Sequence, residues 1–452
     1  MSTFSEHLTQ IISSESVSLA RVFGDDLDAG WIQEACTKAE KATIRRRKFP
    51  SDVVIWLVIA MALWRDMAVV DVARRLGVSL NREKSGKPDR VAKSSTTEAR
   101  QRLGAKPLEA LFFMAAKYWS DQLGPHVRLS HGRQVFALDG TCLLVPDTEG
   151  NRKEFGGPSN QHGTCGYPVV RLMVMMETTS HLVVDAAMAG YSGKGTGELT
   201  LAQGMSARLP DDSILLFDAG LFSCFELWNH QATGKRRDWL GRVKTNLTYT
   251  VIETLAPGDE RARFKVPHNV RREHPETPKW LEVRVLTGKD AKGDVVRLMT
   301  SLVDAQEYTA RELWSLYSER WESELGNREI KTYLLERGDP LRSKTPECIR
   351  QELWGILVAY NLVRYRMGRA AARVGLMGRQ LSFKGALWNI TAFCVAVAWI
   401  HVPTKLPKLL AQLDDVLAED VLPARRKRGT QPRAIKGRTK TWPIKRQTPK
   451  VT

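Results

Sequence analysis

Apolar residues recur at three- and four-residue spacing through the N-terminal part of the chain, and this spacing predicts helices because a helix turns once in about 3.6 residues. The expected helical segments are 5–14, 29–43, 51–66, 69–76, 95–102 and 107–122. Val70–Leu80 combines a helix, a Gly turn and a capping Ser, which fits half of a helix-turn-helix and equally an ordinary turn between helices.

The pattern changes near residue 133, where short apolar runs with turn residues between them predict strands. Helical spacing then alternates with the strands, which is typical of an α/β fold around one mostly covered sheet. The expected strands are Gln134–Asp139, Tyr167–Met176, His181–Met188, Ser213–Asp218 and Trp239–Lys244, with helices at Glu198–Leu209 and Cys224–Ala232.

A second β-rich stretch follows, and then the pattern returns to helices. Gly, Pro and Asp clusters separate the three strands predicted there, which are Leu247–Thr254, Trp280–Leu286 and Val295–Leu302. A long helix is predicted from Ala310 to Leu335, ended by Gly338 and Pro340, with apolar helices near 346–367 and 381–400.

The charge of the chain indicates what kind of partner it binds. The 452-residue chain carries a net charge of +18, and residues 421–452 supply eleven basic residues with no acidic one. Such an excess favours a polyanionic partner, and on DNA a segment of this kind would neutralise phosphates, whereas without a partner it would be a solubilising tail. Arg45–Lys48 fits a DNA contact and a solvated helix face equally.

Composition also bears on a membrane partner and on the redox state of the compartment. The longest apolar runs, Val53–Trp64 and Ile390–Val402, are shorter than the roughly 20 residues that a bilayer requires, so we expect no membrane partner. The six cysteines have no paired spacing, which argues against a disulfide framework or a zinc site and favours a reduced, intracellular compartment.

Two predicted strands each end in an aspartate, Asp139 and Asp218. Carboxylates that converge at one edge of a sheet suit Mg²⁺ or Mn²⁺, which prefer oxygen ligands. Two such ions can activate an attacking oxygen and stabilise a leaving one, as phosphodiester chemistry requires. The sequence therefore predicts a metal site, with a third carboxylate from elsewhere in the chain.

The predicted helix 310–335 offers that carboxylate. Tyr317, Arg320, Glu324 and Lys331 fall within an arc of about 60° on one helical face. In a site, Glu324 would hold metal while Arg320 and Lys331 bind phosphate. By geometry alone, the pair Arg320 and Glu324 fits an ordinary solvated helix face better.

Other candidates compete less well. Asp147 is a rival to Asp139, but its neighbouring Pro and Gly predict a loop beyond the strand. Glu198 begins a predicted helix, where an acidic residue is favourable without any catalytic role. The segment Gly193–Thr196 lacks the first glycine of a phosphate-binding loop, so no nucleotide cofactor is expected.

The spacing Tyr-x2-Arg-x3-Glu-x6-Lys over these four residues resembles the signature of bacterial insertion-sequence transposases of family four. Leu138–Thr141 is similar to the segment of the first catalytic Asp, and Leu215–Phe222 to that of the second, with Ala219 where the family often has a basic residue. Ser95–Gly104 is similar to a segment of the N-terminal region. The resemblance covers roughly residues 20–445.

The resemblance implies a fold and a domain order. A ribonuclease H-like core of class α/β would carry Asp139 and Asp218 on its sheet and Glu324 on a late helix. The implied order is a helical DNA-binding domain (1–125), the first part of the core (126–245), a β insertion (246–305), core completion with C-terminal helices (306–400) and a basic tail (401–452). In some relatives a Trp of the insertion extrudes a base; Trp280 fits that role, although a core Trp is the more ordinary interpretation.

The implied activity is that of a DDE transposase. Asp139, Asp218 and Glu324 would bind two divalent ions, Mg²⁺ or Mn²⁺, and Tyr317, Arg320 and Lys331 would contact DNA phosphates. The partners would be double-stranded DNA of element ends and target, and a second copy of the chain in a synaptic homodimer, in the bacterial cytoplasm at the nucleoid. The rivals are a nuclease of the same fold that cuts without joining and a non-catalytic DNA-binding protein.

Overall fold

The computed structural model describes residues 19–42, 49–76, 92–126, 129–160, 163–290, 293–335, 339–397 and 403–423. Several predictions fall outside these ranges: the helix 5–14, the end of Val70–Leu80, the basic run Arg45–Lys48 and residues 424–452 of the basic tail. Within them, no helix is long and apolar enough to cross a membrane.

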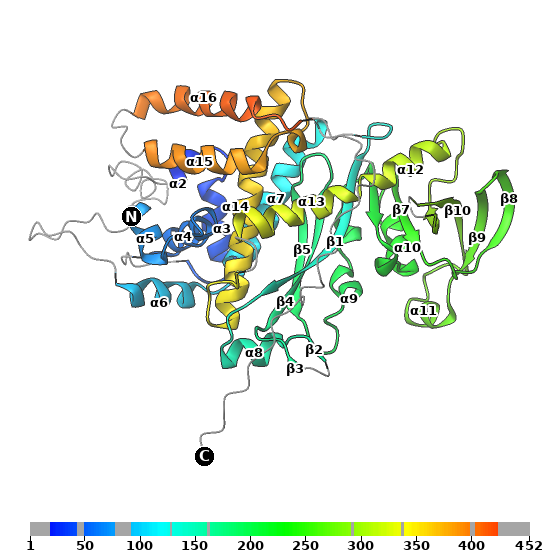
Figure 1. Cartoon of the computed structure of the whole chain (residues 1–452), viewed down its shortest axis with the longest axis horizontal. Coiled ribbons are helices and arrows are strands. Elements are labelled where there is room, and N and C mark those ends of the chain that lie inside the picture. Colours follow the sequence, from blue (N-terminus) through cyan, green and yellow to red (C-terminus); the bar gives the residue numbers. More distant parts are fainter. Residues whose placement is uncertain are drawn as a thin grey trace, which may run out of the picture.

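The N-terminal helices pack around one long C-terminal helix, α14 (Pro346–Arg373), most of whose residues are buried. Figure 1 shows the blue N-terminal helices against this yellow helix, and buried residues from Leu19 to Leu417 form a single apolar core there. The N-terminal elements are α2 (Leu19–Phe23), α3 (Ala29–Lys38), α4 (Ser51–Leu63), α5 (Val69–Arg75), α6 (Lys93–Leu103), α7 (Lys106–Leu123) and the 3₁₀ turn η1 (Gly124–His126).

The chain end adds two helices to this core, α15 (Phe383–Val397) and α16 (Leu406–Glu419), joined by η6 (Pro403–Lys405). Leu413 and Leu417 of α16 are buried, and Asp414 accepts a hydrogen bond from Arg366 of α14 at 2.9 Å. The prediction of a basic tail from residue 401 was therefore wrong for 406–419, where leucines at helical spacing supply an apolar face.

A nine-stranded sheet forms the rest of the molecule, in the order β5-β4-β1-β6-β7-β11-β10-β9-β8. Strands β1, β6 and β7 are parallel, and β4 and β5 form an antiparallel hairpin beside β1. The bounds are β1 (Gln134–Leu144), β4 (Val169–Glu177), β5 (Val183–Gly190), β6 (Ser213–Phe217), β7 (Arg237–Val243), β8 (Thr250–Ala256), β9 (Asp259–Lys265), β10 (Trp280–Lys289) and β11 (Val295–Thr300).

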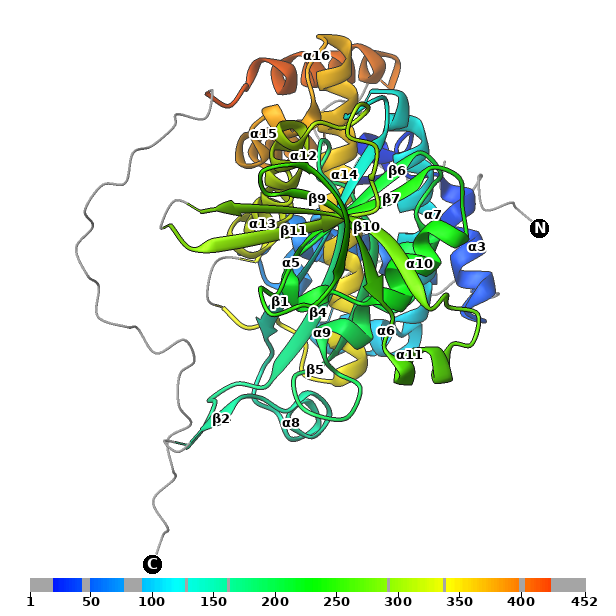
Figure 2. The same ribbon diagram turned by 90° about the vertical axis from the view of Figure 1, so that its right-hand side faces the viewer.

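The predicted β insertion extends the core sheet, because β11 pairs with β7. It contains β9, which the sequence pattern missed, and a short helix, α11 (His268–Glu273). Figure 2, which looks at this end of the molecule, shows the insertion strands continuing the sheet toward the viewer. A separate hairpin of β2 (Ser159–Asn160) and β3 (Gly163–Thr164) follows α8 (Glu149–Phe155).

Helices cover both faces of the sheet. Phe136 and Leu138 pack in one core with residues of α9 (Glu198–Ala202) and α10 (Cys224–Ala232), near the 3₁₀ turn η2 (Ser206–Arg208). Val135 and Ala137 face the opposite side, in a core with Leu313 and Leu316 of α12 (Ala310–Ser318). Since successive residues of a strand point to opposite faces, Asp139 points to the same side as Ala137.

The single helix predicted over 310–335 is divided in three, which corrects that prediction. The first piece is α12, which begins with a capping box between Thr309 and Glu312. A turn at Glu319 and Arg320 separates it from α13 (Trp321–Glu329), and a π-helical turn η4 (Ile330–Leu334) follows. A π turn adds a residue to the helical repeat, which changes the direction of the side chains beyond it.

Candidate active site

Asp139 lies in the middle of β1, where it pairs with Val174 of β4. The prediction that its strand ends at Asp139 was wrong, since β1 continues for five more residues to Leu144. Its half-buried carboxylate faces α13 and accepts a hydrogen bond at Oδ2 from Nδ2 of Asn327, at 2.7 Å. A strand held between β4 and β6 is a rigid support for a reactive side chain.

Asp218 follows the last residue of β6 and begins the 3₁₀ turn η3 (Ala219–Leu221), whose first N–H it binds at 2.7 Å. Strand β6 runs parallel to β1, with Leu216 paired to Ala137. Two residues further along each strand are Asp218 and Asp139, which this register places level with one another on neighbouring strands and on one face.

Glu324 comes from α13, the helix that lies over this face. Its Oε1 accepts a hydrogen bond from Nη2 of Arg320 at 2.7 Å, in a pair whose side chains are 34% and 16% exposed respectively. The charge of Glu324 is felt at Asp139, where it raises the pKa, and the charge of Asp218 is felt at Arg320. The three predicted carboxylates thus share one electrostatic neighbourhood.

Burial and crowding of negative charge shift the pKa of two acidic groups here. Burial raises the pKa of Asp139 and so does Glu324, against the hydrogen bond from Asn327 and the charge of Arg320, which lower it. Burial also raises the pKa of the Tyr317 phenol, and nearby Asp218 adds to this effect. A cation placed among these groups would relieve the repulsion that disfavours their charged forms.

One basic residue of the predicted helical face, Lys331, contacts the strand that carries Asp139. Nζ of Lys331 donates to Oγ1 of Thr141, two residues beyond Asp139 on the same face of β1, at 2.9 Å. Burial lowers the pKa of Arg320, but its hydrogen bond to Glu324 and the neighbouring negative charges outweigh this and raise it. Arg320 and Glu324 form the i, i+4 ion pair that the solvated-face interpretation expects, and Lys331 is exposed although it contacts β1. The metal- and phosphate-binding roles of these residues therefore stay predictions.

The donor set fits divalent cations, because three carboxylates supply the hard oxygen ligands that such ions prefer. As they stand, no three acidic, His or Cys side chains of the described residues are grouped closely enough to hold a metal. Each carboxylate is instead occupied by a donor of the chain: Asn327 for Asp139, the Ala219 N–H for Asp218, and Arg320 for Glu324.

The competing candidates lie elsewhere or have other partners. Asp147 forms an ion pair with Arg152 at 2.5 Å. Glu198 stands in the first turn of α9, with its carboxylate beside Gly140 and so on the face of β1 opposite Asp139.

Trp280 is 40% exposed, so the interpretation as a core Trp was wrong. Trp280 is the first residue of β10. The residue of β10 that lies level with Asp218, followed from strand to strand across β7 and β11, is Leu286. The six residue steps from Trp280 to Leu286 span about 20 Å of strand. A role for Trp280 in extruding a base stays a prediction.

Sequence reasoning missed several neighbours of the carboxylates. Arg242 is exposed on β7, one residue beyond the pairing of Phe217 with Gly241, and so stands level with Asp218. Its charge lowers the pKa of Tyr317. Trp321, at 52% exposed, follows Arg320 directly. Asn327 lies three residues after Glu324, a spacing that places both on one helical face; that spacing was the only available signal.

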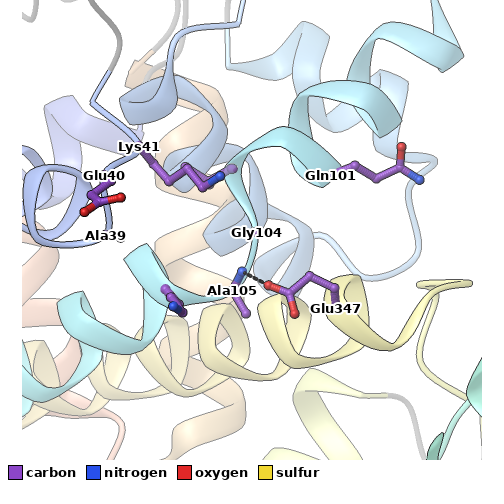
Figure 3. A pocket seen from close by; sticks show the side chains of 9 residues that line it. Ala39, Glu40, Lys41, Gln101, Gly104, Ala105 and Glu347 are labelled. Atoms are coloured by element: carbon purple, nitrogen blue, oxygen red, sulfur yellow. Dashed lines mark hydrogen bonds between the residues drawn. The ribbon is translucent and has the colours of Figure 1, made fainter.

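A pocket of about 350 Å³ that none of these residues lines lies between the end of α3, the junction of α6 with α7 and the start of α14 (Figure 3). Its charged side chains are Glu40, Lys41, Lys106 and Glu347, which balance one another. Oε1 of Glu347 accepts a hydrogen bond from the Ala105 N–H at 2.8 Å, and this contact ties α14 to the start of α7.

Two family descriptions match the chain: "Insertion element 4 transposase N-terminal" over residues 17–113 and "Transposase DDE domain" over residues 130–362. The transposase InsG of insertion sequence element IS4, from Escherichia coli (strain K12), is 32% identical over 421 residues, which are 93% of this chain and 92% of InsG. The chain belongs to the IS4 family of DDE transposases.

The protein is therefore a DNA-cleaving and strand-transferring enzyme that binds DNA and acts in transposition, and its DDE domain depends on divalent metal ions. A second Escherichia coli relative, InsZ, is 33% identical over 281 residues, 58% of this transposase and 88% of InsZ. The piggyBac transposase in a synaptic complex with hairpin DNA aligns with 91% of the transposase and 83% of that chain at 11% identity, with a TM-score of 0.41.

Proposed function

We propose that Asp139, Asp218 and Glu324 form the catalytic trio of this transposase and hold two Mg²⁺ or Mn²⁺ ions. The observation that carries the proposal is the meeting of three separate elements at one place. Strand β1 and the end of β6 present two aspartates in register, and α13 brings Glu324 close enough to raise the pKa of Asp139.

The proposed core is ribonuclease H-like. Its support is the arrangement of β5-β4-β1-β6-β7, with Asp139 on the central strand, Asp218 after the adjacent parallel strand, and Glu324 on a helix that follows the inserted strands. In this interpretation β8 to β11 are the insertion, although they share the sheet of the core.

The proposed reaction consists of two in-line displacements at phosphorus. In the first, a water oxygen bonds to phosphorus at the element end, and the bond to the 3′ oxygen breaks to leave a 3′-hydroxyl. In the second, that hydroxyl oxygen bonds to a target phosphorus and displaces another 3′ oxygen. The bound metal ions would activate the attacking oxygen and stabilise the leaving one.

The basic residues of the site would hold the phosphates in place. Arg320 has a planar guanidinium that can bind phosphate through two parallel hydrogen bonds, and Lys331 adds a positive charge beside β1. Once Glu324 ligates a metal ion, Arg320 needs a new anionic partner, and a DNA phosphate has the charge and shape for it. Tyr317 would orient a phosphate through its neutral hydroxyl.

The DNA partner would be duplex element ends and target DNA, bound by the helical N-terminal region and by the basic residues 421–452, of which only the first three lie within the described residues. Two element ends call for two active sites, and we therefore propose a homodimer on paired ends in the bacterial cytoplasm, at the nucleoid.

The test is cleavage and joining of labelled element-end DNA by full-length transposase in Mg²⁺, with wild type compared to Glu324→Gln. The variant keeps the size of the side chain and removes the charge that would ligate metal. We expect DNA binding within a few-fold of wild type and a loss of both cleavage and joining of at least about 1,000-fold, or roughly 4 kcal/mol.

Glu307→Gln is the matched control, since Glu307 is exposed in the loop before α12 and the substitution removes the same charge. It should cut and join like wild type. Equal activity of Glu324→Gln and wild type would show that Glu324 is not a metal ligand, and cleavage without joining by the wild type would favour a nuclease.

A further inference from the structure

Asn327 is the one side chain of α13 that forms a hydrogen bond to a proposed catalytic aspartate among the described residues. It is 5% exposed, and its Nδ2 donates to Oδ2 of Asp139 at 2.7 Å across 188 residues of sequence. Its carbonyl oxygen, Oδ1, is buried with no hydrogen-bond partner. A buried amide oxygen without a donor costs free energy, so this side chain is retained for something other than stability alone.

The chemistry of the pair fixes which way the amide points. If the amide were turned over, Oδ1 would face a carboxylate oxygen, and neither atom carries a hydrogen to donate. The NH₂ group must therefore face Asp139, and Oδ1 must face away from it with a free acceptor position. That position suits a donor that arrives with the ligands of the site, such as a metal-bound water or a DNA hydroxyl.

An amide holds a carboxylate differently from a guanidinium. Arg320 brings a positive charge to Glu324 and partly cancels its negative charge. Asn327 restrains one oxygen of Asp139 without adding a formal charge, so the carboxylate keeps its negative charge and its second oxygen for a cation. Hydrogen bonds of this kind to a ligating carboxylate orient it, and their loss costs about 10- to 100-fold in metal affinity.

We propose that Asn327 is a positioning residue for Asp139: its amide fixes one carboxylate oxygen so that the other is directed to the metal ion. The proposal rests on the assignment of Asp139 as a metal ligand. It gives α13 two roles in the site, since the helix supplies Glu324 as a ligand and, one turn later, the group that orients the ligand on β1.

The test is Mn²⁺ binding to full-length transposase, measured by electron paramagnetic resonance, for wild type and Asn327→Leu. Leucine has nearly the shape of asparagine and no polar atom. We expect a loss of Mn²⁺ affinity of about 10- to 100-fold. The Mn²⁺ concentration for half-maximal cleavage should rise by the same factor, while the rate at saturating Mn²⁺ returns to within a few-fold of wild type.

The matched control is Asn361→Leu, the same change at a second buried asparagine. Asn361 on α14 accepts a hydrogen bond from the Val183 N–H at 2.9 Å and donates one to the Val183 carbonyl at 2.7 Å, so both of its polar groups are bonded to backbone. It should lower the melting temperature and leave Mn²⁺ affinity unchanged. If Asn327→Leu does not fold, Asn327→Ala removes the amide without adding volume, and the same affinity loss is expected.

Asp139→Ala separates the two proposals. If it loses Mn²⁺ binding while Asn327→Leu and Asn327→Ala bind like wild type, Asn327 does not position Asp139 and only this inference falls. Equal losses in the Asn327 and Asn361 variants would likewise overturn it, because a general loosening of the fold would then explain the effect. If Asp139→Ala binds Mn²⁺ like wild type, Asp139 is not a ligand, and the proposed function falls together with the inference.

Discussion

Arg320 and Glu324 illustrate how single residues prepare the site for a metal ion. Their hydrogen bond of 2.7 Å compensates the charge of Glu324 while its side chain stays about one-third exposed. A pair so accessible contributes little to folding stability, because water screens it. Replacing this pair by a metal ion at Glu324 and a phosphate at Arg320 therefore costs little free energy. This is the behaviour expected of a pair in an active site.

The three carboxylates of the proposed trio were identified from the sequence, and the structure shows hydrogen-bond partners for them that the sequence did not predict. The aspartates follow apolar runs that predict strands, and the four-residue signature marks Glu324. The partner of Asp139 is 188 residues away, however, and no local pattern connects the two. Likewise, the partnership of Lys331 with Thr141 depends on how α13 and its π turn lie on β1, which is a tertiary property.

At the scale of elements, α13 has two faces with different tasks. Glu324 and Asn327 face the site, while Glu322 and Glu329 point into the interior, where each contacts His181 after β4. Glu329 also pairs with the buried Arg364 of α14 and accepts a hydrogen bond from the Tyr360 hydroxyl at 2.9 Å. Buried charges at one geometry favour a single placement of the helix, and hence of Glu324.

The buried ion pair between Glu329 and Arg364 leads to a prediction about the pH dependence of stability. Burial opposes the charge of Glu329, but Arg364 and His181 outweigh it and lower the pKa from 4.5 to about 2. The lowered pKa means that ionised Glu329 stabilises the folded state above pH 4.5, and that this stabilisation is lost as the pH falls toward 2. Glu329→Gln should therefore lower the unfolding free energy near pH 6 by roughly 3 kcal/mol, a deficit that shrinks below pH 4.5.

Denaturant unfolding at a series of pH values measures this difference, with Glu307→Gln as the control, whose stability should follow wild type throughout. If the loss of unfolding free energy in Glu329→Gln stays constant from pH 6 to pH 2, the charge of Glu329 is not what stabilises the folded state at this position.

The limits of sequence-based prediction for these elements have physical reasons. The end of β1 was misplaced because the uninterrupted apolar run stops at Asp139, whereas pairing with β4 on one side keeps the strand extended through Leu144. Strand β9 was missed because its charged residues, such as Arg261 and Arg263, hide the alternation; their neighbours Ala262 and Phe264 are buried.

At the scale of the molecule, the described residues form two regions. One is a helical core built from N-terminal and C-terminal helices, and the other is the nine-stranded sheet. The order of helical, α/β, β-rich and helical regions was predicted from periodicity. That α15 and α16 pack with the N-terminal helices was not, because the packing of distant segments leaves no mark on local periodicity.

The charge at the chain end leads to a prediction for DNA binding. Residues 424–452 contain eleven basic residues and no acidic one. If they contact DNA, their deletion should weaken binding and make it less sensitive to salt, because fewer counterions are released. Filter binding at several salt concentrations measures the slope of log affinity against log salt. An unchanged slope would mean that the segment does not touch DNA, whatever the change in solubility.

The central claim, that the three carboxylates hold the catalytic metal ions, is tested most directly by changing a ligand and the metal together. Asp218 is exposed, so Asp218→Cys leaves the apolar core intact while replacing an oxygen ligand by sulfur. Mg²⁺ accepts sulfur poorly and Mn²⁺ accepts it better. We expect the variant to bind element-end DNA, to fail to cut it in Mg²⁺ and to recover cleavage in Mn²⁺. Cleavage in Mg²⁺ at the wild-type rate would contradict metal ligation by Asp218 and with it the proposed site.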